Sequence, residues 1–283
     1  MSNVNEVNTA PEVQYENNPF NIGLNGIELL FKNAQQVGIY AAILAGVAFL
    51  LNAIASVIDV INTPVNPQNT RSIYSELPNI PIATGNELLI IALVISFVFL
   101  IIVIAFLVGL FLNGILEYTA ARLSLGEKVT FKQAAAASWK NLPGYIWMNI
   151  IKMVKVLLWS LLFIVPGIIM AVRYSLSGVA FFAEDKRGNA AIQRSTQITK
   201  DAWLTTFAGT SLWNIITLGM IAPITQTGAI SVLYKQLRHA TDSNVQKPAA
   251  HWLSWLTLLG PIILLVMMFV FIIGLALLIA AAS

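Results

Sequence analysis

Long apolar stretches alternate with short polar segments along most of this chain. Several stretches approach the roughly 20 residues that a helix needs to cross the hydrocarbon core of a bilayer. The predicted crossings lie at 37–61, 88–112, 145–165, 167–183, 204–220, 221–237 and 255–281. This pattern predicts an all-α fold, a polytopic helical membrane protein with six to seven transmembrane helices. The number of crossings is left open because the segment at 221–237 contains several polar residues. It fits either a crossing or a re-entrant segment covered by protein.

The N-terminal part of the chain has a different composition. Residues 1–18 are polar, acidic and rich in Asn, which predicts a disordered tail before a single helical membrane domain at 19–283. At the start of that domain Phe20, Leu24, Ile27 and Phe31 repeat at three- and four-residue spacing. This spacing predicts a helix with one apolar face in the membrane interface. The helix is either a membrane sensor or an ordinary elbow that leads into the bundle.

Prolines predict two turned hairpins. Pro166 and Gly167 separate the third and fourth predicted crossings, and Pro223 stands at the start of the sixth. In both places an apolar arm is followed by a turn, a shorter polar-dotted arm and basic residues. Short, Pro- or Gly-broken segments in corresponding positions are typical of transporter binding sites. The alternative is a chance similarity, because beyond the turns the two sequences align poorly.

Two interfacial helices are expected on the cytoplasmic side. Thr130 and Gln133 have the spacing of a capping box, which predicts a short helix that ends at Pro143 and Gly144. A second helix is expected to begin at Asn189 as its N-cap. Its inner face is predicted from helical spacing: Ile192, Ser195, Thr199 and Trp203.

The distribution of basic residues predicts the topology. Only 10% of the residues are charged, whereas 57% are hydrophobic. With a cytoplasmic N-terminus and seven crossings, Arg71 falls outside the cell, and the other basic residues that lie beyond the crossings or at their ends fall inside: Lys32, Arg122, Lys128, Lys132, Lys140, Lys186, Arg187, Arg194, Lys200, Lys235, Arg238 and Lys247. This segregation predicts a multi-pass protein of the cell inner (plasma) membrane.

One dense charged patch lies on the predicted cytoplasmic side. It consists of Glu184, Asp185, Lys186 and Arg187. Two adjacent acids are too few ligands for a metal ion, and the neighbouring basic residues neutralise them. The acids are therefore expected to be solvated or to cap a helix.

Some of these positions carry a resemblance to a known family. The matching residues are Pro166, Gly167, Arg173, Ser175, Glu184, Asp185, Ala191, Ser195 and Trp203, together with the segment LYKQLR at 233–238. They resemble the membrane domain fused to some bacterial glycerophosphoryl diester phosphodiesterases, and related stand-alone multi-pass membrane proteins of unassigned function. The resemblance covers roughly residues 19–238 and implies a lipid-associated membrane domain. Because no phosphodiesterase barrel follows, the enzymatic activity of the fused relatives is not expected here.

Three positive charges lie well inside predicted crossings, namely Lys152, Lys155 and Arg173. Charges at membrane depth are costly and mark function by default. Since Asp59 and Glu117 are placed near helix ends, no carboxylate is expected at similar depth, and the cations require a lipid phosphate, an anionic substrate or water. Counted by helical rise from the Pro166 turn, Arg173 lies about 9 Å and Lys155 about 15 Å along adjacent arms. The alternatives are snorkelling lysines and an arginine that bonds backbone carbonyls.

The sequence carries no recognisable catalytic constellation. Without cysteine it has no disulfide, thiolate metal site or thiol nucleophile, and no phosphate loop, nucleophile elbow or HExxH motif appears. We therefore expect no enzyme, no metal, no cofactor and no nucleic-acid partner. The expected partners are membrane lipids, anionic ones among them, and an unidentified protein. Three function classes follow: a non-enzymatic protein that binds or organises anionic lipids or membrane partners, a small transporter or channel-like protein for an anionic or lipidic substrate, and a membrane enzyme of undescribed type.

Overall fold

The computed structural model describes residues 15–32, 87–217, 219 and 221–282. The first predicted crossing at 37–61 and residues 1–14 of the predicted tail lie outside the described residues. The chain divides into two compact units, Met1–Ile39 with Asn113–Ser283, and Tyr40–Leu112. Of the second unit the structure describes the helical residues 87–112, whose apolar side chains are largely exposed from Ser96 onward.

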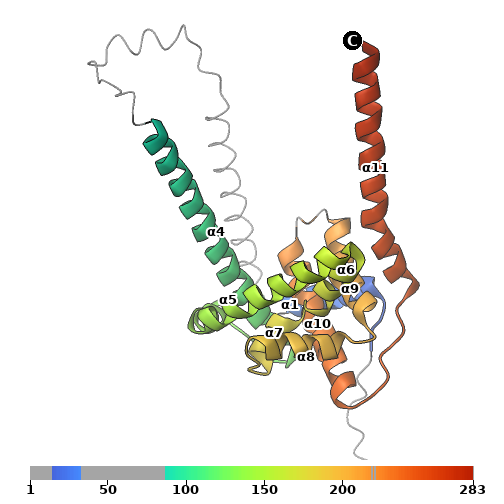
Figure 1. Cartoon of the computed structure of the whole chain (residues 1–283). Helices are drawn as coiled ribbons and strands as arrows, with labels where there is room; N and C mark the ends of the chain where they lie inside the picture. Colours follow the sequence, from blue (N-terminus) through green and yellow to red (C-terminus); the bar gives the residue numbers. More distant parts are fainter. Residues whose placement is uncertain (1–14, 33–86, 218, 220, 283) are drawn as a thin grey trace, which may run out of the picture. The chain divides into compact units, whose positions relative to one another are not determined.

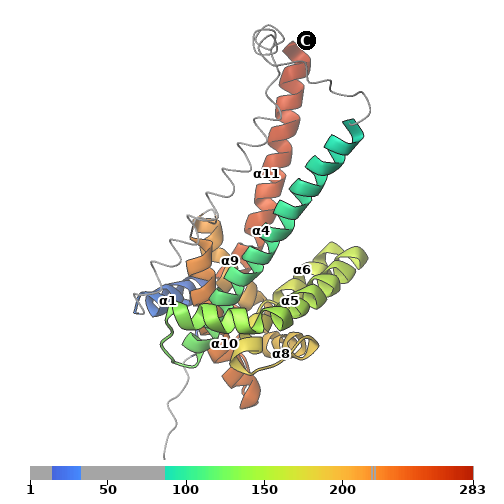
Figure 2. The same cartoon turned by 90° about the vertical axis from the view of Figure 1, so that its left-hand side faces the viewer.

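The fold of the described residues is helical throughout and contains no strand among them. The helices are α1 (Pro19–Phe31), α4 (Glu87–Ser124), α5 (Phe131–Leu162), α6 (Ile164–Arg173), α7 (Ser177–Ala183), α8 (Asn189–Thr199), α9 (Trp203–Ile216), α10 (Ala222–Asp242) and α11 (Trp252–Ala282) (Figure 1). Within the first unit α1 packs on α9 and α10, α11 packs on α9, and α7 packs on α8. Figure 2 shows α5 and α6 side by side as a hairpin.

Among the described residues, three helical stretches are long and apolar enough to cross a membrane. They are Ser96–Ser124, Phe131–Leu162 and Val165–Ala183. The fifth predicted crossing corresponds to α9, whose 14 residues span about 21 Å, short of a hydrocarbon core of roughly 30 Å. The last predicted crossing at 255–281 lies within α11, a helix of 31 residues. The total of six to seven crossings stays a prediction of the sequence.

The end of the predicted disordered tail is ordered instead. The Glu16 backbone N–H donates to Gln236 Oε1 at 3.1 Å, and Gln236 Nε2 donates back to the Glu16 carbonyl at 2.9 Å. Asn17 Nδ2 donates to the Ala249 carbonyl at 2.9 Å. These bonds fix the segment before α1 to α10 and to the connection after it. The polar composition that predicted disorder supplies these hydrogen-bonding groups.

Helix α5 is longer than its sequence predicted. The capping box is confirmed, with the Gln133 N–H donating to Thr130 Oγ1 at 3.4 Å and the Thr130 N–H donating to Gln133 Oε1 at 3.0 Å. The predicted end at Pro143 is wrong, because Pro143 lies inside the helix. A buried stripe continues across the proline, from Ala134 and Ser138 before it to Tyr145 and Met148 after it. Burial of the methionine side chain alone stabilises the fold by about 1.5–3 kcal/mol. This gain offsets much of the roughly 3 kcal/mol that a proline inside a helix costs.

The first hairpin turns at a different residue from the one predicted. Phe163, with an extended backbone at φ −159° and ψ 143°, separates α5 from α6. Pro166 lies in the first turn of α6, where an N–H has no intrahelical partner to lose. A Cβ at Gly167 would lie 2.8 Å from the Ser160 Cα, so glycine allows the two arms to touch. These residues shape the hairpin, but they do not form its turn.

The second hairpin shows the same displacement. Pro223 lies in the first turn of α10, and the described turn residues Thr217, Gly219 and Ile221 precede it. Gly219 has a positive φ of 76°, and its N–H donates to the Asn214 carbonyl at 2.7 Å, which closes the end of α9. Proline at the start of a helix and glycine just beyond the end of the previous one are the usual arrangement.

The fourth predicted crossing is broken at 174–176 into α6 and α7. Ser195 of α8 bonds backbone groups that the break frees. Its hydroxyl donates to the Arg173 carbonyl at 2.6 Å and accepts from the Leu176 N–H at 3.1 Å. The Thr199 hydroxyl donates to the same carbonyl at 3.2 Å. Ile192, Ser195 and Thr199 are all buried, which confirms them as the inner face of α8. The fourth predicted member, Trp203, lies beyond the end of α8 and begins α9. Interrupted helices at membrane depth require this kind of side-chain partner.

Helix α1 packs through the face opposite to the predicted apolar one. Ile22 and Leu30 are fully buried, whereas Phe20, Leu24 and Phe31 are exposed. The exposed face is the one predicted for the membrane interface. On the buried face α1 crosses α10 at a glycine pair, where a Cβ at either Gly26 or Gly228 would lie 2.8 Å from the Cα of the other.

Ser195→Ala tests whether the hydroxyl holds the broken segment together. The substitution removes one donor and one acceptor from buried backbone groups, so we expect it to lower the free energy of unfolding by about 1–3 kcal/mol. Chemical unfolding in detergent micelles measures this value. The control is Thr196→Ala on the same helix, whose hydroxyl bonds only the Ile192 carbonyl of α8 itself, at 2.9 Å. Equal effects of the two substitutions would contradict the assignment.

Candidate functional site

The charged patch predicted on the sequence belongs to a larger ion cluster. Arg194 Nε of α8 donates to both carboxylate oxygens of Glu184 at 3.0 and 2.8 Å, and its terminal nitrogen donates to Asp242 at 2.7 and 2.9 Å. The Tyr234 hydroxyl donates to Glu184 at 2.7 Å. Arg238 lies 4.0 Å from Glu184 and 3.6 Å from Asp242. The cluster therefore joins the end of α7 to α8 and α10.

The two acids of the patch were expected to be solvated or to cap a helix. Glu184 is the C-cap residue of α7, but its side chain is not solvated. Its side chain and that of Arg194 are only 16% and 15% exposed. Asp185 is exposed and pairs with Arg187, which also donates to Asn141 at 2.9 Å, and Lys186 is exposed. Burial opposes the charge of Arg194, but its hydrogen bonds to Glu184 and Asp242 outweigh this and raise its pKa. The Arg194 guanidinium thus stays charged.

The structure places the three predicted cations against different partners. The Lys155 ammonium donates to the Asn189 side chain at the start of α8. Asn189 is the first residue of α8, and the N-cap is Gly188. The prediction of Asn189 as the N-cap is therefore wrong. Lys152 lies near enough to Glu117 to interact with it electrostatically. Arg173 ends α6, and its Nε is buried without a hydrogen-bond partner among the described residues.

Glu117 is the buried anion that sequence reasoning missed. Because α4 continues to Ser124, Glu117 lies inside the helix, and it is 7% exposed. Its carboxylate accepts from the Tyr145 hydroxyl at 2.7 Å, and that hydroxyl accepts from Asn113 Nδ2 at 2.7 Å. The expectation of no carboxylate beside the cations is therefore wrong. The sequence signal was the one-turn spacing of Asn113 and Glu117, just beyond the predicted end of the crossing at 112.

The Glu117 carboxylate rests directly on α7. A Cβ at Gly178 would overlap the carboxylate, so glycine is required there. Tyr145 also packs on α7 through its ring, whose centroid lies 5.9 Å from that of Phe181 and 5.6 Å from that of Phe182. The acid is consequently held by α4, α5 and α7 together.

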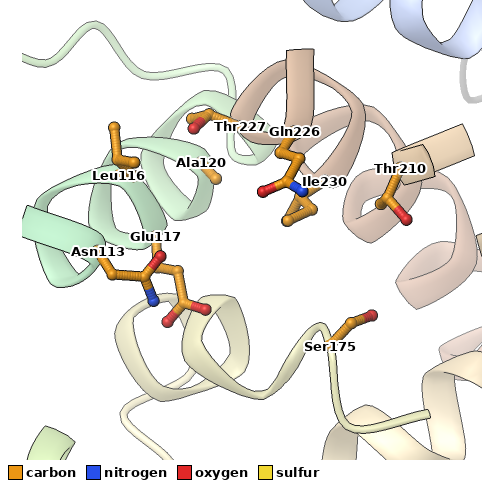
Figure 3. A pocket seen from close by; sticks show the side chains of 9 residues that line it. All are labelled: Asn113, Leu116, Glu117, Ala120, Ser175, Thr210, Gln226, Thr227 and Ile230. Carbon is orange, nitrogen blue, oxygen red and sulfur yellow. The ribbon is translucent and has the colours of Figure 1, made fainter. Parts of the chain in front are cut away.

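Glu117 lies at the edge of a polar pocket of about 210 Å³. The pocket lies between α4, the α6–α7 connection, α9 and α10, and Figure 3 shows side chains from these elements around it. Its polar lining residues are Asn113, Glu117, Ser175, Thr210, Gln226 and Thr227, and its apolar ones are Leu116, Ala120 and Ile230. The pocket thus separates the two hairpins that the prolines predicted. Among the described residues no group of three His, Asp or Glu side chains lies together.

Comparison with protein-family models, curated proteins and solved structures finds no match to this chain. The resemblance to the phosphodiesterase-associated membrane domain therefore stays a prediction. The structure nevertheless gives physical roles to several of its residues. Ser195 hydrogen-bonds the Arg173 carbonyl at the broken helix. Glu184 belongs to the ion cluster through its bond to Arg194.

Arg194→Gln tests the ion cluster as a structural pin. It leaves the mostly buried Glu184 without its counter-charge, so we expect the free energy of unfolding to fall by about 2–3 kcal/mol, somewhat below the value for a fully buried pair. Lys32→Gln is the matched control, because its pair with Glu28 is 71% and 63% exposed and an exposed pair contributes little to stability. Thermal and chemical unfolding in detergent compare the two variants. If Arg194→Gln lowers the free energy of unfolding no more than Lys32→Gln does, the ion cluster does not stabilise the fold.

Proposed function

We propose that the chain is a non-enzymatic integral membrane protein that binds or organises anionic lipids at the α5–α6 hairpin. Arg173 is the principal contact, and Lys155 and Lys152 add positive charge. The observation that carries this proposal is the buried Arg173 Nε without a hydrogen-bond partner among the described residues. An arginine with a free donor in an apolar segment requires an anion, and its planar fork fits phosphate.

The charge balance around the hairpin supports the same function. Lys155 is bonded to a neutral amide, and Lys152 faces one carboxylate. Three cations against the one acid, Glu117, leave two positive charges (3 − 1 = 2). Lipid phosphates supply the missing negative charge without any further protein group. The alternative was that Arg173 bonds backbone carbonyls. Its Nε, which has no hydrogen-bond partner among the described residues, does not support this alternative.

We further propose that the protein lies in the cell inner membrane, with several crossings and a cytoplasmic N-terminus. The three stretches long enough to cross support a multi-pass arrangement. The orientation rests on the segregation of basic residues. In this arrangement the ion cluster and the exposed residues Lys186 and Arg187 face the cytoplasm.

A small transporter for an anionic or lipidic substrate is the second candidate. The observation that favours it is the polar pocket between the two hairpins, where a transporter requires a polar path. A transporter also requires two accessible states. The lipid-binding proposal ranks first because it needs only the arrangement described here.

Arg173→Gln tests the proposed anion site. The amide keeps a polar side chain but loses the charge and the fork, so we expect bound anionic phospholipid to fall about tenfold while the fold is kept. Native mass spectrometry of the purified protein with its co-purified lipids provides the measurement. Lys235→Gln is the control: it also removes one positive charge, from an exposed position on α10, and should leave lipid binding unchanged. A folded Arg173→Gln variant with wild-type lipid content would refute the site.

Cysteine labelling tests the proposed orientation in this naturally cysteine-free chain. Lys186→Cys places a thiol on the exposed connection between α7 and α8. A membrane-impermeant maleimide should label it in inverted vesicles and not in intact cells. A cysteine at Arg71, which is predicted outside, should give the reverse result. Labelling of Lys186→Cys in intact cells would overturn the topology.

A further inference from the structure

The polar pocket presents hydrogen-bond acceptors rather than donors. The Thr210 hydroxyl donates to the Thr206 carbonyl at 2.8 Å, and the Thr227 hydroxyl donates to the Pro223 carbonyl at 2.6 Å. A hydroxyl has one proton, so after these bonds both side chains offer only oxygen lone pairs to the pocket.

The same accounting applies to the α4 side of the pocket. Asn113 Nδ2 has two N–H groups, and it bonds both Tyr145 and the Glu117 carboxylate, which leaves the amide oxygen as the pocket-side acceptor. Glu117 contributes a carboxylate, which accepts only when it is ionised. The lining carries no lysine or arginine that would oppose a cationic or donor-rich ligand.

Two further groups remain free. Ser175 Oγ has no hydrogen-bond partner among the described residues. Gln226 is exposed, lines the pocket and makes no side-chain hydrogen bond within the part of the chain that the structure describes. Each of these side chains carries an oxygen that can accept from the ligand, so both add to the acceptor preference of the rest of the polar lining.

We propose that this pocket binds the hydrogen-bond-donating end of a phospholipid head group, a hydroxyl or a primary ammonium. The inference rests on the lipid-binding function proposed above and names the part of the lipid that it selects. Arg173 and Ser175 are two positions apart, at most about 7 Å along the chain, so a phosphate at Arg173 and its distal group at Ser175 belong to one head group. The volume of about 210 Å³ suits such a small group, since pockets for drug-sized ligands begin at roughly 300 Å³.

Lipid pairs of equal charge isolate this selection from the effect of Arg173. Phosphatidylethanolamine and phosphatidylcholine share a net charge but differ in ammonium N–H groups. Phosphatidylglycerol and phosphatidylmethanol share a negative charge but differ in glycerol hydroxyls. The purified protein is titrated with each of the four lipids, and binding is followed by native mass spectrometry. We expect the donor-bearing lipid of each pair to bind about three- to tenfold more tightly, the range for one or two net hydrogen bonds.

Pocket variants locate the source of that ratio. Gln226→Met and Ser175→Ala should each lower the within-pair preference by about two- to tenfold. Gln193→Met, an equivalent change at an exposed position on α8, should leave it unchanged. Because Gln226 is exposed, its variant keeps the fold even if the Ser175 variant does not.

The outcomes separate this inference from the proposed function. Arg173→Gln should weaken all four lipids and leave both ratios intact. If wild-type protein shows no preference within either pair, or if the preference persists in Gln226→Met, the pocket assignment is wrong while the arginine site stands. If Arg173→Gln changes nothing but Gln226→Met abolishes the ratios, the arginine site is wrong and the pocket stands.

Discussion

A helix that breaks inside an apolar segment frees backbone groups that lipid cannot satisfy, and one serine meets that need here. Ser195 donates to the Arg173 carbonyl and accepts from the Leu176 amide, so α8 is held against the break between α6 and α7. Because the break is fixed, Arg173 stands at the end of α6 and Ser175 reaches the pocket. Helix α7 buries residues 177–182 and places Gly178 against the Glu117 carboxylate. The proposed lipid contact and the proposed pocket thus depend on the same side chain, which also belongs to the motif that suggested a family resemblance.

Local patterns carried the sequence predictions that the structure bears out. The Thr130 capping box and the buried face of α8 both depend on residues within two helical turns, where spacing determines contact. The prediction that Pro143 ends a helix was wrong because the preference of a single residue yielded to packing along a buried stripe on both sides of it. The hairpin turns were misplaced by a few residues for a related reason. Pro166 and Pro223 start the returning helices instead of forming the turns that precede them.

The chemistry of the site was less predictable, because its contacts join residues far apart in the chain. Glu117 was set aside as a helix-end residue, since the apolar pattern weakens at Asn113 although the helix continues to Ser124. Arg194 connects Glu184 to Asp242, and no spacing in the sequence reveals that contact. Each predicted cation does lie beside the hairpin, but the sequence could not indicate that each would face a different partner.

The glycine pair at the crossing of α1 and α10 has a consequence for the order in which the protein is made. Gly26 leaves the ribosome before its partner Gly228, which is synthesised some two hundred residues later. At about 5–20 residues per second, α1 spends on the order of ten to forty seconds without its packing surface. During that interval the exposed apolar face of α1, which includes Phe20 and Leu24, can bind to the bilayer surface. Docking of α1 is therefore a late event of biogenesis, and it closes the domain only after the translation of α10 is complete.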